Sequence, residues 1–236
     1  MRRVKVDTRA KAADTVMYTS ETFVDYPDVY VSDTRFSATK RVTDANPCQR
    51  EYKWGHRILF AYTNTDGVRL QGILAIPDDI QKGQRRPMLV NFYEKVSQTL
   101  HKHYAPRYAT GAATVLTEMV SRGYLEMEPD IHFNGRTTGS DMLECVEAAV
   151  RKVVELGYAD PARIGLQGHS FSGYGSAYIA TRSKMFAAVA CGAGTMNLAS
   201  DHNRLWGWSD LNRNGSGDNA NGYNIHRTGE IWHESV

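Results

Sequence analysis

The chain has 236 residues, of which 42% are hydrophobic and 23% are charged, and its formal net charge is +2. This composition is typical of a globular protein, and the small net charge gives no reason to expect nucleic acid or an anionic membrane as a partner. No apolar run is long enough to span a membrane, and the basic residues near the N-terminus are not followed by the apolar segment of a signal peptide.

The three cysteines, Cys48, Cys145 and Cys191, are odd in number and widely spaced. They form no C-x-x-C pair and no Cys/His cluster, so the sequence does not predict structural zinc. Cys145 falls on the apolar side of a predicted helix, and Cys191 ends a predicted strand. Packing in the core is therefore expected for both.

Residues 1–56 are predicted to be β-rich, with short strands at 15–20 and 28–32 separated by Asp25-Tyr26-Pro27. So few strands are not expected to close a sheet or bury a core of their own. This segment is therefore expected to belong to something larger, or to pack on the later part of the chain.

From Arg57 onward the pattern is clearer. Strand-like runs at 58–62 and 68–76 flank Asn64-Thr65-Asp66-Gly67, and the Asp-Gly pair predicts a hairpin. A buried strand at 87–93, a helix at 112–122 that ends at Gly123, and a strand at 124–129 come next.

Two polar groups accompany these elements. Glu126, Glu128 and Asp130 alternate along a strand end, so they share one face. They are expected to be solvated, although such a face could also attract a cationic substrate group. The segment from His101 to His103 is expected to be a solvated loop.

A helix is predicted at 141–156, with Asp141 as its cap and Gly157 at its end. A strand at 164–167, a helix at 174–182 and a strand at 186–190 come after it. Strands that alternate with helices indicate a mostly parallel sheet with helices on both faces. Sites in such sheets lie at the carboxyl ends of the strands, where Tyr93 and Ser170 both fall.

The segment Gly168-His169-Ser170-Phe171-Ser172-Gly173 has the order of a nucleophile elbow, a tight turn that carries a serine between a strand and a helix. Ser170 would be the nucleophile, and the backbone N–H of Phe171 would stabilise the oxyanion. Ser172 occupies the last position of G-x-S-x-G, where glycine is usual, and must then adopt an unfavourable backbone conformation. The alternative is a Gly/Ser-rich turn without chemistry.

These residues resemble the prolyl oligopeptidase family of serine peptidases, within the α/β-hydrolases, over roughly residues 15–236. Residues 160–165 followed by 168–174 are similar to the nucleophile segment of that family. Residues 65–72 with Ile76-Pro77 resemble the start of its hydrolase domain. Pro47 and the strands before it resemble the end of its N-terminal β-propeller.

Residues 88–98 resemble the segment in which a tyrosine hydroxyl is the second oxyanion donor, a place that Tyr93 takes here. Glu94-Lys95-Val96 stand where the family has a Gly-Gly-Pro-like continuation.

The resemblance implies two domains: residues 1–56 as the end of a propeller-like domain, and residues 57–236 as an α/β-hydrolase domain that is incomplete at its C-terminus. The catalytic acid and histidine are then expected beyond Val236, and this chain alone is expected to be inactive. Of the histidines that follow Ser170, His202, His226 and His233 are expected to have ordinary roles. Residues 210–221 begin like a calcium loop but end in Asn221 instead of a bidentate glutamate.

The prediction is a serine-type peptidase that hydrolyses peptides through an acyl-enzyme, without cofactor or metal and with no nucleic-acid or membrane partner. An esterase or acyl hydrolase on the same fold and an inactive interaction module are the alternatives. Exo- or endo-cleavage and oligomeric state stay open. So does the compartment, which would be cytoplasmic, or periplasmic or secreted if a signal lies upstream.

Overall fold

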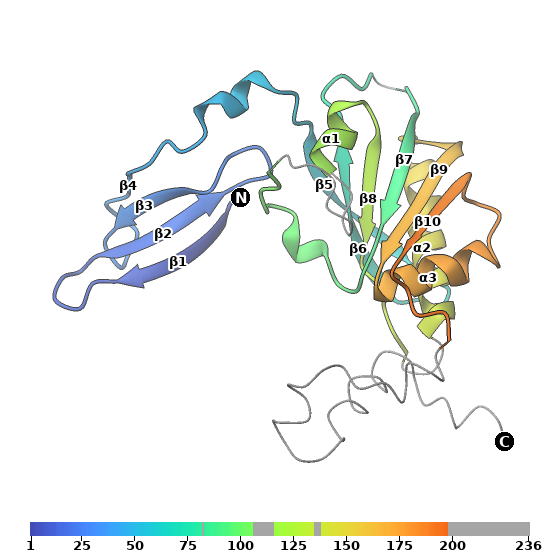
Figure 1. Ribbon diagram of the computed structural model, residues 1–236. Coiled ribbons are helices and arrows are strands. Elements are labelled where there is room, and N and C mark those ends of the chain that lie inside the picture. The colour runs from blue at the N-terminus through green and yellow to red at the C-terminus, as the bar shows by residue number, and fades with distance from the viewer. Residues whose placement is uncertain (82, 106–115, 135–137, 198–236) are drawn as a thin grey trace, which may run out of the picture.

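The computed structural model describes residues 1–81, 83–105, 116–134 and 138–197, and it contains two β-sheets. Figure 1 shows the smaller, N-terminal sheet to one side of the larger sheet. A short 3₁₀ helix, η1 (Pro47–Glu51), lies on the segment that joins them. No helix in the described part of the chain has the length and apolar character needed to cross a membrane.

The N-terminal sheet is an antiparallel meander of four strands in chain order: β1 (Arg3–Arg9), β2 (Val16–Glu21), β3 (Asp28–Ser32) and β4 (Lys40–Arg41). The strands predicted at 15–20 and 28–32 are confirmed as β2 and β3. They belong to a sheet because β1 and β4 pair with their outer edges. Stacking of Tyr18 on Tyr30, with ring centroids 5.5 Å apart, stabilises one face of this sheet.

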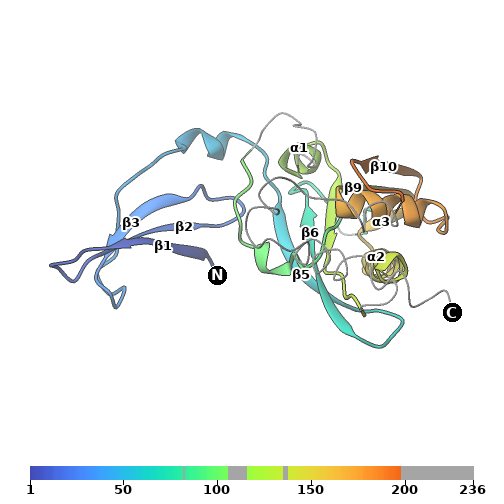
Figure 2. The same cartoon turned by 60° about the horizontal axis from the view of Figure 1, so that its bottom comes forward.

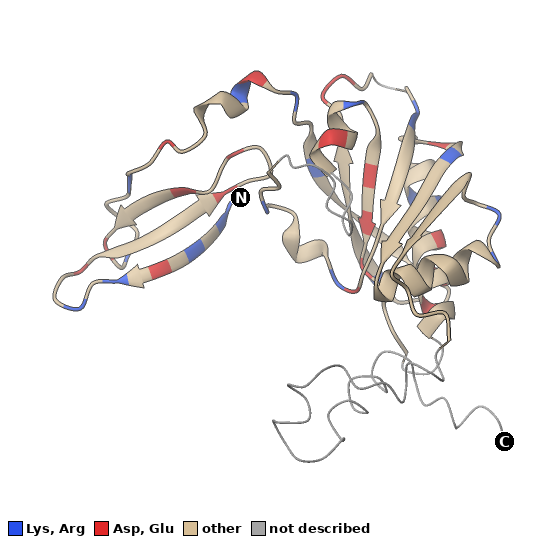
Figure 3. Cartoon of the chain, in the orientation of Figure 1, with Lys and Arg blue, Asp and Glu red and all other residues tan. Residues whose placement is uncertain are grey.

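Prediction missed β1 because charged side chains alternate along it and the whole strand is exposed. Figure 3 shows this mixture of basic and acidic residues on β1.

The larger sheet has the order β10-β9-β7-β8-β6-β5. Its strands are β5 (His56–Thr63), β6 (Arg69–Ile76), β7 (Arg86–Asn91), β8 (Leu125–Pro129), β9 (Ala159–His169) and β10 (Ala188–Gly192). The pairs β7–β8, β7–β9 and β9–β10 are parallel, whereas β6 is antiparallel to both β5 and β8. The predicted hairpin is β5–β6, and Gly67 in its turn has a φ of 78° that favours glycine.

Helices cover both faces of this sheet, as predicted for an α/β-hydrolase fold. They are α1 (Leu116–Ser121), α2 (Thr138–Glu155) and α3 (Phe171–Ala180). Figure 2 shows α1 on one face and α2 and α3 on the other. The alternation along β6 agrees: Leu74 and Ile76 belong to the main core, whereas Ala75 packs in a cluster with Leu116 and Val120 of α1.

Helix α2 supplies the centre of the main core. Its fully buried apolar side chains are Met142, Cys145, Val146, Ala149, Val150 and Val153. Asp141 does not cap the helix, because the helix has begun by Thr138, and its carboxylate accepts the backbone N–H of Asn134 at 3.0 Å. The helix ends before Gly157, which has a φ of 85°.

The expected packing of the cysteines is confirmed for Cys145 and wrong for Cys191. Cys145 is fully buried between α2 and the sheet, whereas Cys191 is exposed. The reason is that β10 is an edge strand, and among the described residues its outer edge pairs with no further strand.

The acidic residues along the end of β8, visible in Figure 3, are buried or nearly so, and not solvated as expected. Glu128 forms an ion pair with Arg57, whose guanidinium is 5.5 Å from the ring centroid of Phe23 and 5.2 Å from that of Tyr104. Phe23 comes from the N-terminal segment and Tyr104 from the loop after β7. These two segments therefore cover a face of the sheet that the local sequence pattern predicts to be exposed to solvent.

His103 also departs from the expected solvated loop. Its ring is buried, its Nδ1 lies 3.2 Å from the backbone oxygen of Phe23, and the Trp54 and Tyr26 rings lie 5.2 and 5.4 Å from it. Burial lowers the pKa of His103 below its ordinary value of 6.5, although the hydrogen bond to the Phe23 carbonyl and the charges of Glu21 and Asp25 oppose the shift. The neutral imidazole is therefore part of the contact between the N-terminal segment and the larger sheet.

This burial predicts a pH-dependent stability. Below pH 6.5 the unfolded chain binds a proton at His103 before the folded chain does, so the free energy of unfolding falls as the pH is lowered through this range. Between pH 7.5 and 5.5 the contribution of one such group reaches at most about 1.4 kcal/mol. Urea unfolding at the two pH values should show a smaller loss for His103→Gln than for the wild type.

His101→Gln, two residues away on the same loop, serves as the control and should keep the wild-type pH dependence. An unchanged pH dependence in His103→Gln would show that His103 takes up a proton equally readily in the folded and unfolded chains.

Candidate active site

The candidate nucleophile, Ser170, occupies the turn between the carboxyl end of β9 and the first residue of α3. Its backbone angles are φ 61° and ψ −119°. These are the angles of the first central residue of a type II′ turn, a position that favours glycine. A serine in this conformation costs about 1–3 kcal/mol, which the surrounding structure must offset.

Backbone hydrogen bonds hold this turn from both sides. The N–H of Ser170 donates to the carbonyl of Gly192 at 2.8 Å, and its carbonyl accepts the N–H of Tyr174 at 3.1 Å. The hydroxyl of Ser172 accepts the N–H of His169 and donates to the carbonyl of His169, both at 3.0 Å. The strained residue is thus fixed between β10 and the first turn of α3.

Ser172 differs from the expectation. It lies within α3 and is only 2% exposed, and it is absent from the described non-glycine residues with positive φ, which are Phe36, Ser170 and Ala193. The strain is therefore at Ser170, and the place of the usual motif glycine tolerates a serine because its conformation there is helical.

Three glycines permit the close approach of backbone around the turn. A Cβ on Gly168 would overlap the carbonyl of Ser172, and a Cβ on Gly173 would overlap the carbonyl of Gly192. A Cβ on Gly194 would overlap the backbone of Gly173. Gly192 and Gly194 are not among the predicted site residues, although glycines at and just after the end of a strand are a signal of such an approach.

The predicted oxyanion donors lie at the same edge of the sheet. Phe171 is the first residue of α3, where backbone N–H groups have no acceptor within the helix. Tyr93 follows the carboxyl end of β7 by two residues, and its ring packs edge-on against that of Phe171 with centroids 6.1 Å apart. The structure thus brings Tyr93 next to the residue that follows Ser170.

Phe133, in the segment after β8, also packs against Phe171, with centroids 5.6 Å apart. Phe133 is not among the site residues predicted from the sequence. The only signal was its position after a strand that lies in the same parallel sheet. Tyr93, Phe171 and Phe133 together form an aromatic wall beside the elbow.

Among the described residues, no histidine, His169 included, is hydrogen bonded to the Ser170 hydroxyl. His202, His226 and His233, and the calcium-like residues 210–221, lie outside the described residues. In the described ranges, no three His, Cys, Asp or Glu side chains are grouped so that they could hold a metal ion.

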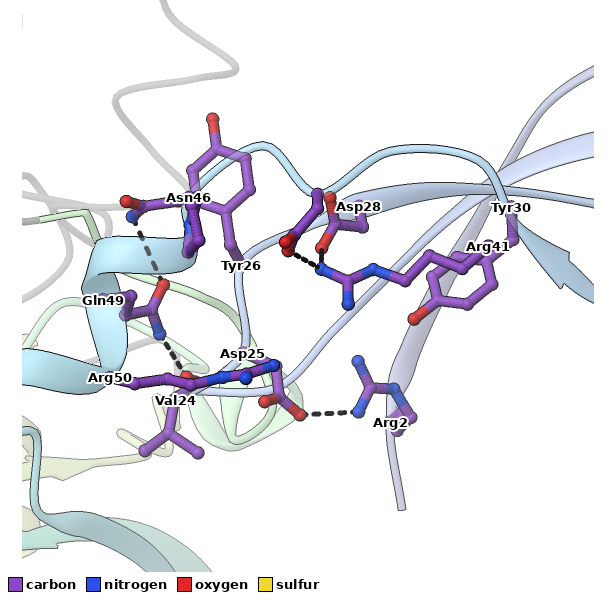
Figure 4. A pocket seen from close by; sticks show the side chains of 12 residues that line it. Arg2, Val24, Asp25, Tyr26, Asp28, Tyr30, Arg41, Asn46, Gln49 and Arg50 are labelled. Atoms are coloured by element: carbon purple, nitrogen blue, oxygen red, sulfur yellow. Dashed lines mark hydrogen bonds and ion pairs between the residues drawn. The ribbon is translucent and has the colours of Figure 1, made fainter.

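A separate cavity of about 240 Å³ lies between the N-terminal sheet and η1, away from the elbow (Figure 4). Arg2 pairs with Asp25 across it at 2.6 Å, and Arg41 pairs with Asp28 and Asp44. These ion pairs largely neutralise the charged side chains that line the cavity. Neither Ser170 nor Tyr93 is among its lining residues.

A serine on a strained strand–turn–helix elbow, at the carboxyl edge of a mostly parallel sheet with helices on both faces, defines the α/β-hydrolase class. Residues 131–228, which include the elbow, match the model of the prolyl oligopeptidase family. The resemblance seen in the sequence is thereby confirmed for that part of the chain.

Solved structures agree with this fold. The acylaminoacyl peptidase of Pyrococcus horikoshii superposes with a TM-score of 0.65 at 19% identity, over 81% of this chain and 31% of that one. An acylaminoacyl peptidase in complex with Z-Gly-Gly-Phe-chloromethyl ketone gives 0.64 at 20% identity, over 85% and 33%. Dipeptidyl peptidase 4 of Porphyromonas gingivalis gives 0.60 at 18% identity, over 81% and 28%.

The chain therefore spans about a third of the length of these relatives. A search of curated proteins finds no match.

The close approach at the elbow predicts that Gly168→Ala is severely destabilising. The added methyl would overlap the Ser172 carbonyl, which belongs to backbone and cannot move aside, so we expect a loss of about 3 kcal/mol in the free energy of unfolding. Gly165→Ala in the same strand is the matched control. Its nearest neighbour is the end of the Leu89 side chain, 3.2 Å away, so its loss should stay below about 1 kcal/mol. Urea unfolding of both variants decides, and equal losses would contradict the close packing at Gly168.

Proposed function

We propose that this chain is the nucleophile-bearing part of a serine peptidase of the prolyl oligopeptidase type. The observation that carries the proposal is the backbone of Ser170, held at φ 61° between β9 and α3. A structural turn at this place has no need of a strained serine, whereas a nucleophile must stand clear of the sheet to meet its substrate.

In the proposed reaction the Ser170 oxygen attacks the carbonyl carbon of a peptide bond, and a base takes the hydroxyl proton. The N–H of Phe171, at the positive end of the α3 dipole, and the hydroxyl of Tyr93 stabilise the oxyanion of the tetrahedral intermediate. The amine leaves with a proton from the same base, and water then hydrolyses the acyl-enzyme. The proposal places the base and its acid partner outside the described residues.

A peptide substrate is favoured over a simple ester by the family match and by the similar solved structures, which are peptidases by their descriptions. One of them holds a peptidyl chloromethyl ketone. The aromatic wall beside the elbow would contact the side chain next to the scissile bond.

The test is labelling with a fluorophosphonate, which reacts with activated serine nucleophiles, in the full-length protein as its gene encodes it. Ser170→Ala should abolish labelling and lower the hydrolysis of an N-acylated peptide substrate about 10³-fold or more.

Ser183→Ala is the control. Ser183 lies beyond the end of α3, and its hydroxyl donates a hydrogen bond to the carboxylate of Glu147 in α2. The variant should keep the wild-type labelling rate. A folded wild-type protein that neither labels nor cleaves peptides would favour an interaction module over an enzyme. Labelling with cleavage of esters alone would favour the acyl hydrolase.

A further inference from the structure

Asp130 is a buried carboxylate at the carboxyl end of β8 that the proposed reaction does not use. It is 5% exposed. Its Oδ1 accepts the backbone N–H of Val96 at 2.6 Å and that of Ser97 at 2.8 Å. Hydrogen bonds to an ionised acceptor are about twice as strong as neutral ones, so this is a firm attachment between two distant segments.

Asp130 is itself fixed by its neighbours in the sheet. Its N–H donates to the carbonyl of Gln71 in β6 at 2.9 Å, and its carbonyl accepts the hydroxyl of Tyr62 in β5. The next residue, Ile131, donates its N–H to the carbonyl of Glu94 at 2.7 Å. The end of β8 thus holds residues 94–97 through three hydrogen bonds.

This held segment begins directly after Tyr93. Glu94-Lys95-Val96 contains no glycine or proline that would impose a turn by itself, so its shape depends on contacts from outside. The hydroxyl of Tyr93 can serve as an oxyanion donor only if its backbone is held in place, because an error of about 1 Å can cost about 100-fold in rate.

We propose that Asp130 is the positioning residue of the oxyanion site: its carboxylate fixes residues 96 and 97 and thereby holds the Tyr93 hydroxyl in line with Ser170. The inference rests on the proposed function. It assigns Asp130 no contact with substrate, and it predicts that the effect of Asp130 on the reaction passes through Tyr93.

A double-mutant cycle in the full-length protein tests this, with the second-order rate constant of fluorophosphonate labelling at Ser170 as the readout. The phosphonyl oxygen occupies the oxyanion site, so Tyr93→Phe should slow labelling about 100-fold. Asp130→Ala should slow labelling about tenfold when Tyr93 is present, but less than about twofold in the Tyr93→Phe background. The reason is that the effects of substitutions at residues that act as a unit do not add.

Asp130→Asn keeps the size and one acceptor oxygen, and it should fall between wild type and Asp130→Ala. If Asp130→Ala does not fold, the same cycle with Asp130→Asn decides. Hydrogen exchange at the amides of Val96 and Ser97 should speed up in either variant.

Asp28→Asn is the matched control. Asp28 is another buried aspartate that accepts a backbone N–H, that of Ala45 at 2.9 Å, but it lies in the N-terminal sheet. This variant should lose stability and keep the labelling rate.

An equal loss of rate from Asp130→Ala in both backgrounds would overturn the proposal, and so would an unchanged rate with faster amide exchange. No labelling of the folded wild-type protein would overturn the proposed function itself, and this inference with it.

Discussion

The geometry of the candidate site depends on one constraint, the strained backbone of Ser170. A residue with a side chain persists at φ 61° only where the structure on both sides prevents relaxation. Here β10 supplies the carbonyl that binds the Ser170 amide, and the first turn of α3 binds its carbonyl. The glycines at 168, 173 and 194 allow these backbones to approach closely enough for both contacts. The parallel sheet and its crossing helix therefore act together as the support for a single side chain.

Buried charged and polar groups also join the N-terminal segment to the larger sheet. The local sequence pattern predicts that these groups are solvated, but residues from distant segments bury them. Arg57 lies between the rings of Phe23 and Tyr104 and pairs with Glu128, and the backbone of Phe23 contacts His103. Breaking a buried ion pair of this kind typically costs about 3–5 kcal/mol, because the remaining charge has no partner. The N-terminal segment is thus part of the cover of the larger sheet.

The proposed catalytic groups also come from several distant segments of the chain. In the proposal, β9 and α3 present the nucleophile and one oxyanion donor, and the loop after β7 presents the other. The end of β8 holds that loop from behind. Each contribution comes from the carboxyl end of a different strand, so the site is assembled by the parallel sheet and not by any single stretch of sequence. The chain spans about a third of the length of its structural relatives.

The alternation of strands and helices, the β5–β6 hairpin and the strand–serine–helix order at Ser170 could all be predicted from the sequence, because periodicity and glycines close in the chain encode them. The burial of His103 and Asp130, the exposure of Cys191 and the helical conformation of Ser172 could not. Those depend on contacts between distant residues: 80 positions separate His103 from Phe23, and 34 separate Asp130 from Val96. Folding of the whole chain brings such pairs together, since the packing of entire elements, and not local preference, decides which polar groups lose water and which partners they find.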